Sequence, residues 1–292
     1  MGIVNGSDLT GMTCVITGAS SGLGRESARA LASAGAHVVL AARNPDALLK
    51  TRDWIHAELP NAKTSIVELD LASLASVRLA AAAIAEIAPA IDVLMNNAGV
   101  MFTPFGRTED GFEMQLGTNH LGHFALTNLL SARLEAAGNG RVINLSSEGH
   151  RLGDIDLDDP NWERREYDKY SAYGAAKTAN VLHAVELNRR LFKRGIRAYA
   201  VHPGMVATHL MRHMSSEDVA VATSSADIST FEVLTPEEGA ATQVWAAVDP
   251  NLRDHGGVYL ADCRISREVA RYAVDDARAG RLWDISTALC GD

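Results

Sequence analysis

The chain has 292 residues and a net charge of −9, with 47% apolar and 22% charged residues. No run approaches the roughly 18 uninterrupted apolar residues of a membrane-spanning helix. No basic cluster offsets the negative charge, which argues against nucleic acid or an anionic membrane as the main partner. A disulfide framework is excluded by the number and scatter of the cysteines, Cys14, Cys263 and Cys290. The first ten residues lack the features of a secretory signal, so we expect a cytoplasmic protein.

The first predicted elements are a buried strand at residues 12–17 and a helix at 25–35. Between them lies the glycine-rich stretch TGASSGLG, residues 17–24. Such a turn between a strand and a helix lets the backbone approach a pyrophosphate and directs the helix N-terminus at it. The stretch therefore predicts a dinucleotide site, with an ordinary glycine turn as the alternative.

The same alternation continues to the end of the chain. Further strands are expected at residues 36–42, 64–71, 91–97, 141–147, 196–202 and 257–261, and helices at 46–59, 73–88, 111–136 and 171–194. This pattern predicts one doubly wound, Rossmann-type α/β domain over residues 1–292. Its sheet would be mostly parallel and seven-stranded, with helices on both faces.

Two stretches interrupt the alternation. Residues 148–169 are polar and acidic, and residues 205–231 are rich in methionine. Both follow strand ends, where ligands bind in open α/β sheets, so we expect an insertion at 148–169 and a substrate lid at 205–231. Met205, Met211 and Met214 are adaptable apolar side chains and, with Trp162 and Tyr167, candidate substrate contacts. Alternatively, the methionines only pack the lid on its own domain.

Tyr173 and Lys177 stand four residues apart on a predicted helix, so their side chains share one face. A neighbouring ammonium can stabilise a phenolate, which would let the tyrosine act as a general acid or base. For this pair alone, a helical tyrosine beside a solvated lysine is the alternative.

Motifs spread along nearly the whole chain resemble those of the short-chain dehydrogenase/reductase family, in the family's order. They are Thr17-Gly-x-x-x-Gly22-x-Gly24, Asp70, Asn96-Asn97-Ala98-Gly99, Asn119, Ser147, Tyr173-x-x-x-Lys177 and Pro203-Gly204. The stretches 110–113, 119–124 and 281–284 resemble the retinol dehydrogenase branch and its bacterial relatives. The separation of Ser147 and Tyr173 exceeds that in most of the family, but this branch has a comparable insertion. The branch does not establish retinoids as substrates.

The resemblance implies a role for each catalytic candidate. Tyr173 would exchange a proton with the substrate oxygen, and Lys177 would lower the tyrosine pKa and hold the nicotinamide ribose. Ser147 would polarise the carbonyl, and Asn119 would hold a proton-relay water. Besides Tyr173 and Lys177, the implied cofactor contacts are Gly18, Ser20, Ser21, Gly22, Leu23, Gly24, Arg43, Asp70, Leu71, Asn97, Ala98, Gly99, Pro203, Gly204, Val206 and Thr208. The family also implies a homodimer or homotetramer formed through helices 111–136 and 171–194.

The end of the second strand predicts which cofactor is used. Ala42 stands where an NAD-specific site has an acidic residue, and Arg43 follows it and could meet a 2′-phosphate. Arg43 could instead stack on the adenine or cap the sheet. No metal is expected, because His209 and His213 lack further ligands.

Together these features predict an NADP(H)-dependent oxidoreductase that interconverts a bulky apolar ketone or aldehyde and its alcohol. The alternatives are a reductase of an activated C=C bond and a non-catalytic dinucleotide-binding sensor.

Overall fold

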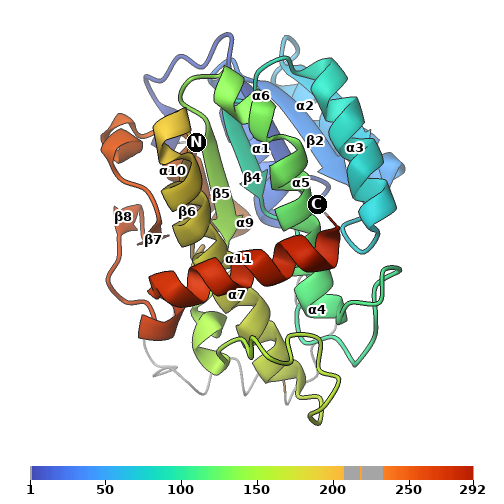
Figure 1. Cartoon of the computed structure of the whole chain (residues 1–292). Helices are drawn as coiled ribbons and strands as arrows, with labels where there is room; N and C mark the ends of the chain where they lie inside the picture. The colour runs from blue at the N-terminus through green and yellow to red at the C-terminus, as the bar shows by residue number, and fades with distance from the viewer. Residues whose placement is uncertain (1, 207–217, 219–232, 292) are drawn as a thin grey trace.

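The computed structural model describes residues 2–206, 218 and 233–291. Within these residues, one sheet contains eight strands in the order β3-β2-β1-β4-β5-β6-β7-β8 (Figure 1). The strands are β1 (Thr13–Thr17), β2 (His37–Ala42), β3 (Lys63–Glu68), β4 (Val93–Asn96), β5 (Arg141–Leu145), β6 (Arg197–Val201), β7 (Val258–Ala261) and β8 (Arg264–Ile265). The doubly wound α/β fold is confirmed.

The sheet has one strand more than the seven predicted. Strands β1 to β7 pair in parallel, whereas β8 is antiparallel to β7, with Ile265 opposite Leu260 and Arg264 opposite Ala261. Both residues of β8 are exposed. A two-residue exposed strand has no hydrophobic periodicity, which is why the sequence pattern does not reveal it.

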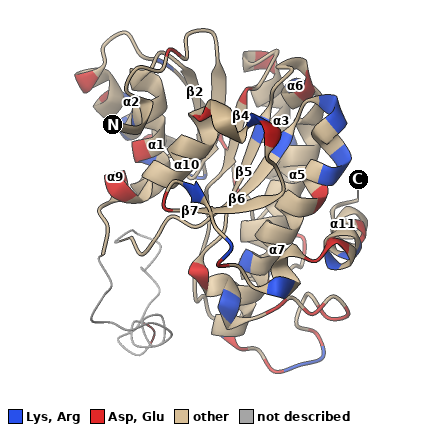
Figure 2. Cartoon of the chain, turned by 90° about the vertical axis from the view of Figure 1, so that its left-hand side faces the viewer, with Lys and Arg blue, Asp and Glu red and all other residues tan. Residues whose placement is uncertain are grey.

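Helices cover both faces of the sheet, as Figure 2 shows with the sheet between two helical layers. Alternate residues of a strand enter different cores: Val15 of β1 packs in one, and Cys14 and Ile16 pack in the other. One layer contains α1 (Gly22–Ser33), α2 (Pro45–Glu58), α9 (Pro236–Gly239) and α10 (Ala241–Val248); the other contains α3 (Leu74–Ile87), α5 (Gly122–Leu129), α7 (Lys169–Leu191) and α11 (Asp276–Cys290). Burial on both faces accounts for the continuous apolar runs of the strands.

The single helix predicted at residues 111–136 is instead divided into four. It consists of α4 (Met114–Leu116), a π-helical segment η2 (Gly117–Leu121), α5, and α6 (Ser131–Ala136). A Cβ at Gly122 would lie 2.5 Å from the carbonyl oxygen of Leu71, so this glycine allows the helix to pack closely on the turn after β3. Apolar periodicity runs through the breaks, so it could not predict them. π-helical turns are frequent at functional sites, and Asn119 lies in this one.

The remaining short helical segments are η1 (Gly2–Val4), η3 (Glu148–Leu152), η4 (Phe192–Arg194), η7 (Pro250–Asp254) and η8 (Arg271–Val274). No described helix is both long and apolar enough to cross a bilayer.

Helix α11 crosses α7 on the outside of the molecule (Figure 1). Its residues Ala279, Leu282 and Cys290 are buried in the core that α5 and α7 also form. This face of α5 and α7 is thus covered within the chain. A homodimer or homotetramer built on these two helices would have to use their other surfaces or displace α11.

Candidate active site

Ser147, Tyr173 and Lys177 meet beyond the carboxyl end of β5. Ser147 caps η3, and its hydroxyl oxygen accepts the Gly149 N–H at 3.0 Å and also hydrogen-bonds to Tyr173. A Cβ at Gly149 would lie 2.6 Å from Cε1 of Tyr173, so only glycine lets η3 lie against the phenol ring. The neighbouring Ser146 is directed elsewhere, because its hydroxyl donates to the Lys177 carbonyl at 2.9 Å.

Burial shifts the pKa values of the two groups on α7 in opposite directions. Tyr173 is only 3% exposed, and burial raises its pKa to about 12 although the Ser147 hydrogen bond acts in the opposite direction. Burial also lowers the pKa of Lys177 to about 8. The lysine Nζ donates to the Leu145 carbonyl at 3.0 Å and lies 5.7 Å from the centre of the Tyr173 ring. The net shift of the tyrosine pKa is upward and is caused by burial, and the phenol keeps its proton at neutral pH.

Asn119 lies beside the same group. Its amide forms two hydrogen bonds to the backbone of Val100, accepting from the N–H at 2.8 Å and donating to the carbonyl at 3.0 Å. A Cβ at Gly99 would lie 2.9 Å from Asn119 Oδ1 and 3.7 Å from Lys177 Nζ. Gly99, Asn119 and Lys177 are thus close neighbours, and the glycine is required by this close approach.

The glycine-rich turn contacts the loop after β4. Gly18 has a φ of +67°, and a Cβ there would lie 2.9 Å from the Cα of Ala98. A Cβ at Gly24 would lie 2.6 Å from the side-chain nitrogen of Asn97, which itself donates to the Thr17 carbonyl at 2.8 Å. Helix α1 begins at Gly22, directly after Ser20 and Ser21, so its first free N–H groups face this edge of the sheet.

A buried histidine connects the glycine-rich turn to the π-helical segment. The Thr17 hydroxyl accepts from the backbone N–H groups of Asn97 at 2.9 Å and Ala98 at 3.0 Å, and lies 2.8 Å from His123 Nε2. His123 Nδ1 lies 2.9 Å from the Asn119 carbonyl, which can only accept. This assigns the proton to Nδ1. Burial lowers the pKa of His123 to about 4, so the ring is neutral.

Other predicted cofactor contacts lie along the same edge of the sheet. Arg43 is exposed directly after β2, next to the buried Ala42. Asp70 and Leu71 follow β3, and the Asp70 carboxylate accepts the Ala72 N–H at 2.9 Å.

Pro203 and Gly204 follow β6, and Gly204 has a φ of +84°. A Cβ at Gly239 would overlap with Val206 and lie 2.9 Å from Leu23, so Val206 and Leu23 flank the same glycine of α9. The start of the predicted lid thus reaches the glycine-rich turn.

The described residues include some, but not all, of the predicted substrate and cofactor contacts. Thr208, Met211 and Met214 lie outside the described residues, as do His209 and His213. Trp162 is buried within the insertion, with the Arg165 guanidinium 3.7 Å above its ring and Tyr167 5.3 Å away between ring centres. The Met205 carbonyl accepts the Leu234 N–H at 2.8 Å.

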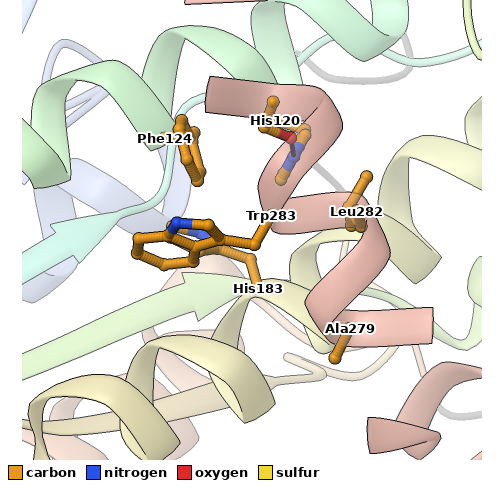
Figure 3. Close-up of a pocket in the computed structure, with 7 residues that line it drawn as sticks. His120, Phe124, His183, Ala279, Leu282 and Trp283 are labelled. Atoms are coloured by element: carbon orange, nitrogen blue, oxygen red, sulfur yellow. Dashed lines mark hydrogen bonds between the residues drawn. The ribbon is translucent and has the colours of Figure 1, made fainter. Parts of the chain in front are cut away.

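A small gap beneath α11 is separate from this site. Its walls include the rings of His120, Phe124, His183 and Trp283 (Figure 3). The rings leave no room for a ligand. Among the described residues, no group of three or more His, Cys, Asp or Glu side chains is arranged to hold a metal ion.

Several residues of the site were not predicted from the sequence. They are His123, Gly149 and the Leu145 carbonyl, together with Phe102, which packs on Tyr173. Their roles depend on contacts between segments distant in sequence, such as the close approach of Gly149 to the Tyr173 ring.

A glycine-rich turn packed on an Asn-Ala-Gly loop, with a serine, a tyrosine and a lysine at the adjacent strand end, defines a dinucleotide-dependent oxidoreductase. Residues 12–219 match the model of the short chain dehydrogenases. The chain belongs to the short-chain dehydrogenase/reductase family, is similar to its retinol dehydrogenases, and is an enzyme acting on the CH–OH/C=O couple.

Relatives match the chain over nearly its whole length. Retinol dehydrogenase 13 of Homo sapiens is 42% identical over 284 residues, covering 97% of this chain and 86% of the relative. Short-chain dehydrogenase TIC 32 A, chloroplastic, of Brassica napus is 38% identical over 300 residues, covering 98% and 91%.

Solved structures share the fold. The crystal structure of an uncharacterized protein from Mycobacterium Paratuberculosis has a TM-score of 0.77 and 35% identity, covering 99% of this chain and 97% of that one. The Pseudomonas aeruginosa RhlG/NADP active-site complex has a TM-score of 0.69 and 25% identity, covering 87% and 96%.

Proposed function

We propose that this protein is an NADP(H)-dependent oxidoreductase that interconverts a bulky, mostly apolar ketone or aldehyde and its alcohol, with Tyr173 as general acid and base. The observation that carries the proposal is the convergence of Ser147, Tyr173 and Lys177 beside the Asn97–Gly99 loop. A buried phenol that keeps its proton is the group that reduction of a carbonyl requires as a donor.

In the reduction direction, the Ser147 hydroxyl donates a hydrogen bond to the substrate carbonyl and polarises it. A nicotinamide cofactor, when bound, would be the source of the hydride for the carbonyl carbon. Tyr173 then gives its proton to the oxygen, because an alkoxide is a far stronger base than a phenolate. The Lys177 ammonium stabilises the phenolate left behind and holds the nicotinamide ribose, and Asn119 holds the water through which the proton is replaced.

The cofactor would lie along the carboxyl ends of β1 to β6. The glycine-rich turn fits a pyrophosphate because Gly18 and Gly24 leave no side chain between the backbone and the ligand. Asp70 and Leu71 would flank the adenine. Pro203, Gly204, Val206 and Thr208 would border the nicotinamide.

Preference for NADP(H) over NAD(H) follows from Ala42 and Arg43. No carboxylate at position 42 would repel a 2′-phosphate, and the exposed Arg43 guanidinium can bind it. The contact should favour NADP by about 1.5–3 kcal/mol, or roughly ten- to a hundredfold in kcat/KM. The related RhlG structure is described as an NADP complex. We expect Ala42→Asp/Arg43→Ile to reverse the preference; a parent enzyme that prefers NADH would refute the assignment.

A panel of ketones, aldehydes and enones, assayed by NADPH oxidation, tests the reaction type. Turnover of aryl or polycyclic carbonyls with higher kcat/KM than small polar ones supports the proposal and the lid at residues 205–231. Turnover of enones alone would indicate C=C reduction, and tight NADPH binding without any turnover would indicate a sensor. Localisation of a tagged chain tests the expected cytoplasmic location.

A further inference from the structure

Phe102 has a backbone conformation that phenylalanine rarely adopts. Its φ is +53°, in the left-handed region, although its side chain is only 2% exposed. Such a conformation is unfavourable for a residue other than glycine, and it persists only where surrounding contacts hold it. Phe102 follows the Asn97–Gly99 loop by three residues. The strain is therefore located at the edge of the proposed active site.

A buried glutamine holds this strained backbone in place. Gln115 Oε1 accepts the Phe102 N–H at 2.8 Å, and Gln115 is fully buried. The amide nitrogen of the same side chain donates to the hydroxyl of Tyr167 and to the carbonyl of Lys169, each at 2.9 Å. The Gln115 side chain accepts one of these hydrogen bonds and donates the other two. An amide can do both, because it has an acceptor oxygen and a donor nitrogen.

Tyr167 brings the 148–169 insertion into this network. Its hydroxyl lies 3.1 Å from both the Thr103 carbonyl and Glu113 Oε1, and it is the acceptor for Gln115. The Glu113 carboxylate is fully buried and also accepts the backbone N–H of Gln115 at 2.9 Å. The insertion is thus tied by side-chain hydrogen bonds to the loop that contains Phe102.

The Phe102 ring packs on the proposed general acid. Its centre lies 5.3 Å from that of Tyr173 at an interplanar angle of 78°, and 4.9 Å from that of Tyr170 at 77°. Both are edge-to-face contacts of favourable geometry. The backbone of Gly149 packs against the Cε1 edge of Tyr173. The phenol ring thus contacts both the Phe102 ring and the Gly149 backbone.

We propose that Phe102 is a positioning residue for Tyr173, and that the insertion, through Tyr167 and Gln115, determines where the Phe102 ring lies. The inference rests on the proposed function, because it assumes that Tyr173 transfers the proton. It gives the insertion a part in catalysis through Tyr167, in addition to any contact that Trp162 makes with substrate. A displacement of about 1 Å of a reacting group can cost on the order of a hundredfold in rate, so a small loosening of the ring is measurable.

The first experiment compares Phe102→Leu and Phe102→Gly with the parent. Leucine keeps an apolar side chain, whereas glycine adopts the positive φ without strain and removes the ring alone. Phe124→Leu is the matched control, because Phe124 is equally buried but packs on Trp283 under α11. The measurements are kcat and KM with the carbonyl compound that the parent reduces fastest, the NADPH dissociation constant, and Tm.

We expect both Phe102 variants to lose tenfold or more in kcat while the NADPH dissociation constant stays within twofold of the parent value. Phe124→Leu should lower Tm and leave kcat within twofold. A kcat within twofold of the parent in both Phe102 variants would overturn the proposal. Loss of kcat in Phe124→Leu equal to that in Phe102→Leu would also overturn it, because the effect would then be general destabilisation.

The second experiment tests the connection to the insertion. Tyr167→Phe removes only the hydroxyl, and we expect a kcat loss of about threefold to tenfold. Combined with Phe102→Leu it should cause little further loss, since residues that act through one another are not additive. Full multiplication of the two losses would refute the connection. An active Tyr173→Phe would refute the proposed function itself. If Tyr173→Phe is inactive and the Phe102 variants keep their kcat, only this inference is refuted.

Discussion

Replacing Lys177 by methionine should make the protein more stable and inactive. The lysine is only 4% exposed, and burial of its ammonium lowers its pKa from 10.5 to about 8. A buried charge destabilises the folded state, whereas methionine has similar length and no charge. The Leu145 carbonyl would keep a partner after the substitution, because Asn180 also donates to it at 2.9 Å.

The pKa change sets the magnitude. The difference between 10.5 and about 8 corresponds to about 3 kcal/mol at neutral pH. Between pH 8 and 10.5 the unfolded chain binds a proton at this lysine that the folded chain does not. The stability of the parent therefore rises with pH in this window and the penalty disappears by its upper end. Because the ammonium also loses one hydrogen bond, we expect a net gain of about 1–3 kcal/mol for Lys177→Met at pH 7.

Urea unfolding of the parent and of Lys177→Met at pH 7 and pH 9.5 provides the test, with kcat/KM measured alongside. The difference in unfolding free energy should shrink at the higher pH, and the variant should be inactive. Lys50→Met at an exposed site of α2 is the control and should change stability by about 0.5 kcal/mol or less. A variant less stable than the parent at pH 7, or a difference independent of pH, would refute the reasoning.

Two further predictions concern buried polar groups. Burial lowers the pKa of His120 to about 3, and the nearby His123 acts in the same direction. Below pH 6.5 the unfolded chain therefore binds a proton at this histidine that the folded chain does not, and the folded state loses stability as the pH falls. The parent should lose unfolding free energy between pH 7 and pH 5, and His120→Phe should reduce this loss by about 2 kcal/mol. The control His255→Asn, at an exposed site, should not reduce it. A loss in His120→Phe equal to that of the parent would contradict the prediction. Thr17→Val leaves the Ala98 N–H without its acceptor, whereas the Asn97 N–H keeps the Met95 carbonyl at 2.9 Å. The substitution should cost about 1–3 kcal/mol in urea unfolding, and Thr17→Ser should cost less than about 1 kcal/mol. Equal costs would show that the hydroxyl is unimportant.

The sequence was sufficient for the architecture because its signals are local. Alternating apolar strands and capped helices predict seven of the eight strands, and the central parallel strands are buried on both faces. The helix at residues 111–136 was predicted without its breaks, because the apolar periodicity continues through them. Strand β8 was missed because two exposed residues carry no pattern.

The site shows the same division between local and long-range information. The spacing of Tyr173 and Lys177 predicted that they would share a helical face, and they do. The burial that raises the Tyr173 pKa was not predicted, because it comes from segments distant in sequence. Phe102 and Gln115 were not identified, since their importance arises from a backbone angle and from one hydrogen bond.

The most direct test of the proposed mechanism is single-turnover reduction of the best carbonyl substrate by Tyr173→Phe, together with its NADPH dissociation constant. Phenylalanine keeps the ring that packs on Phe102 and removes only the proton donor. We expect the variant to bind NADPH within about threefold of the parent and to lose turnover by three orders of magnitude or more, within the range expected when a general acid also loses its activating hydrogen bond. Turnover within tenfold of the parent would contradict the assignment of Tyr173 as the proton donor.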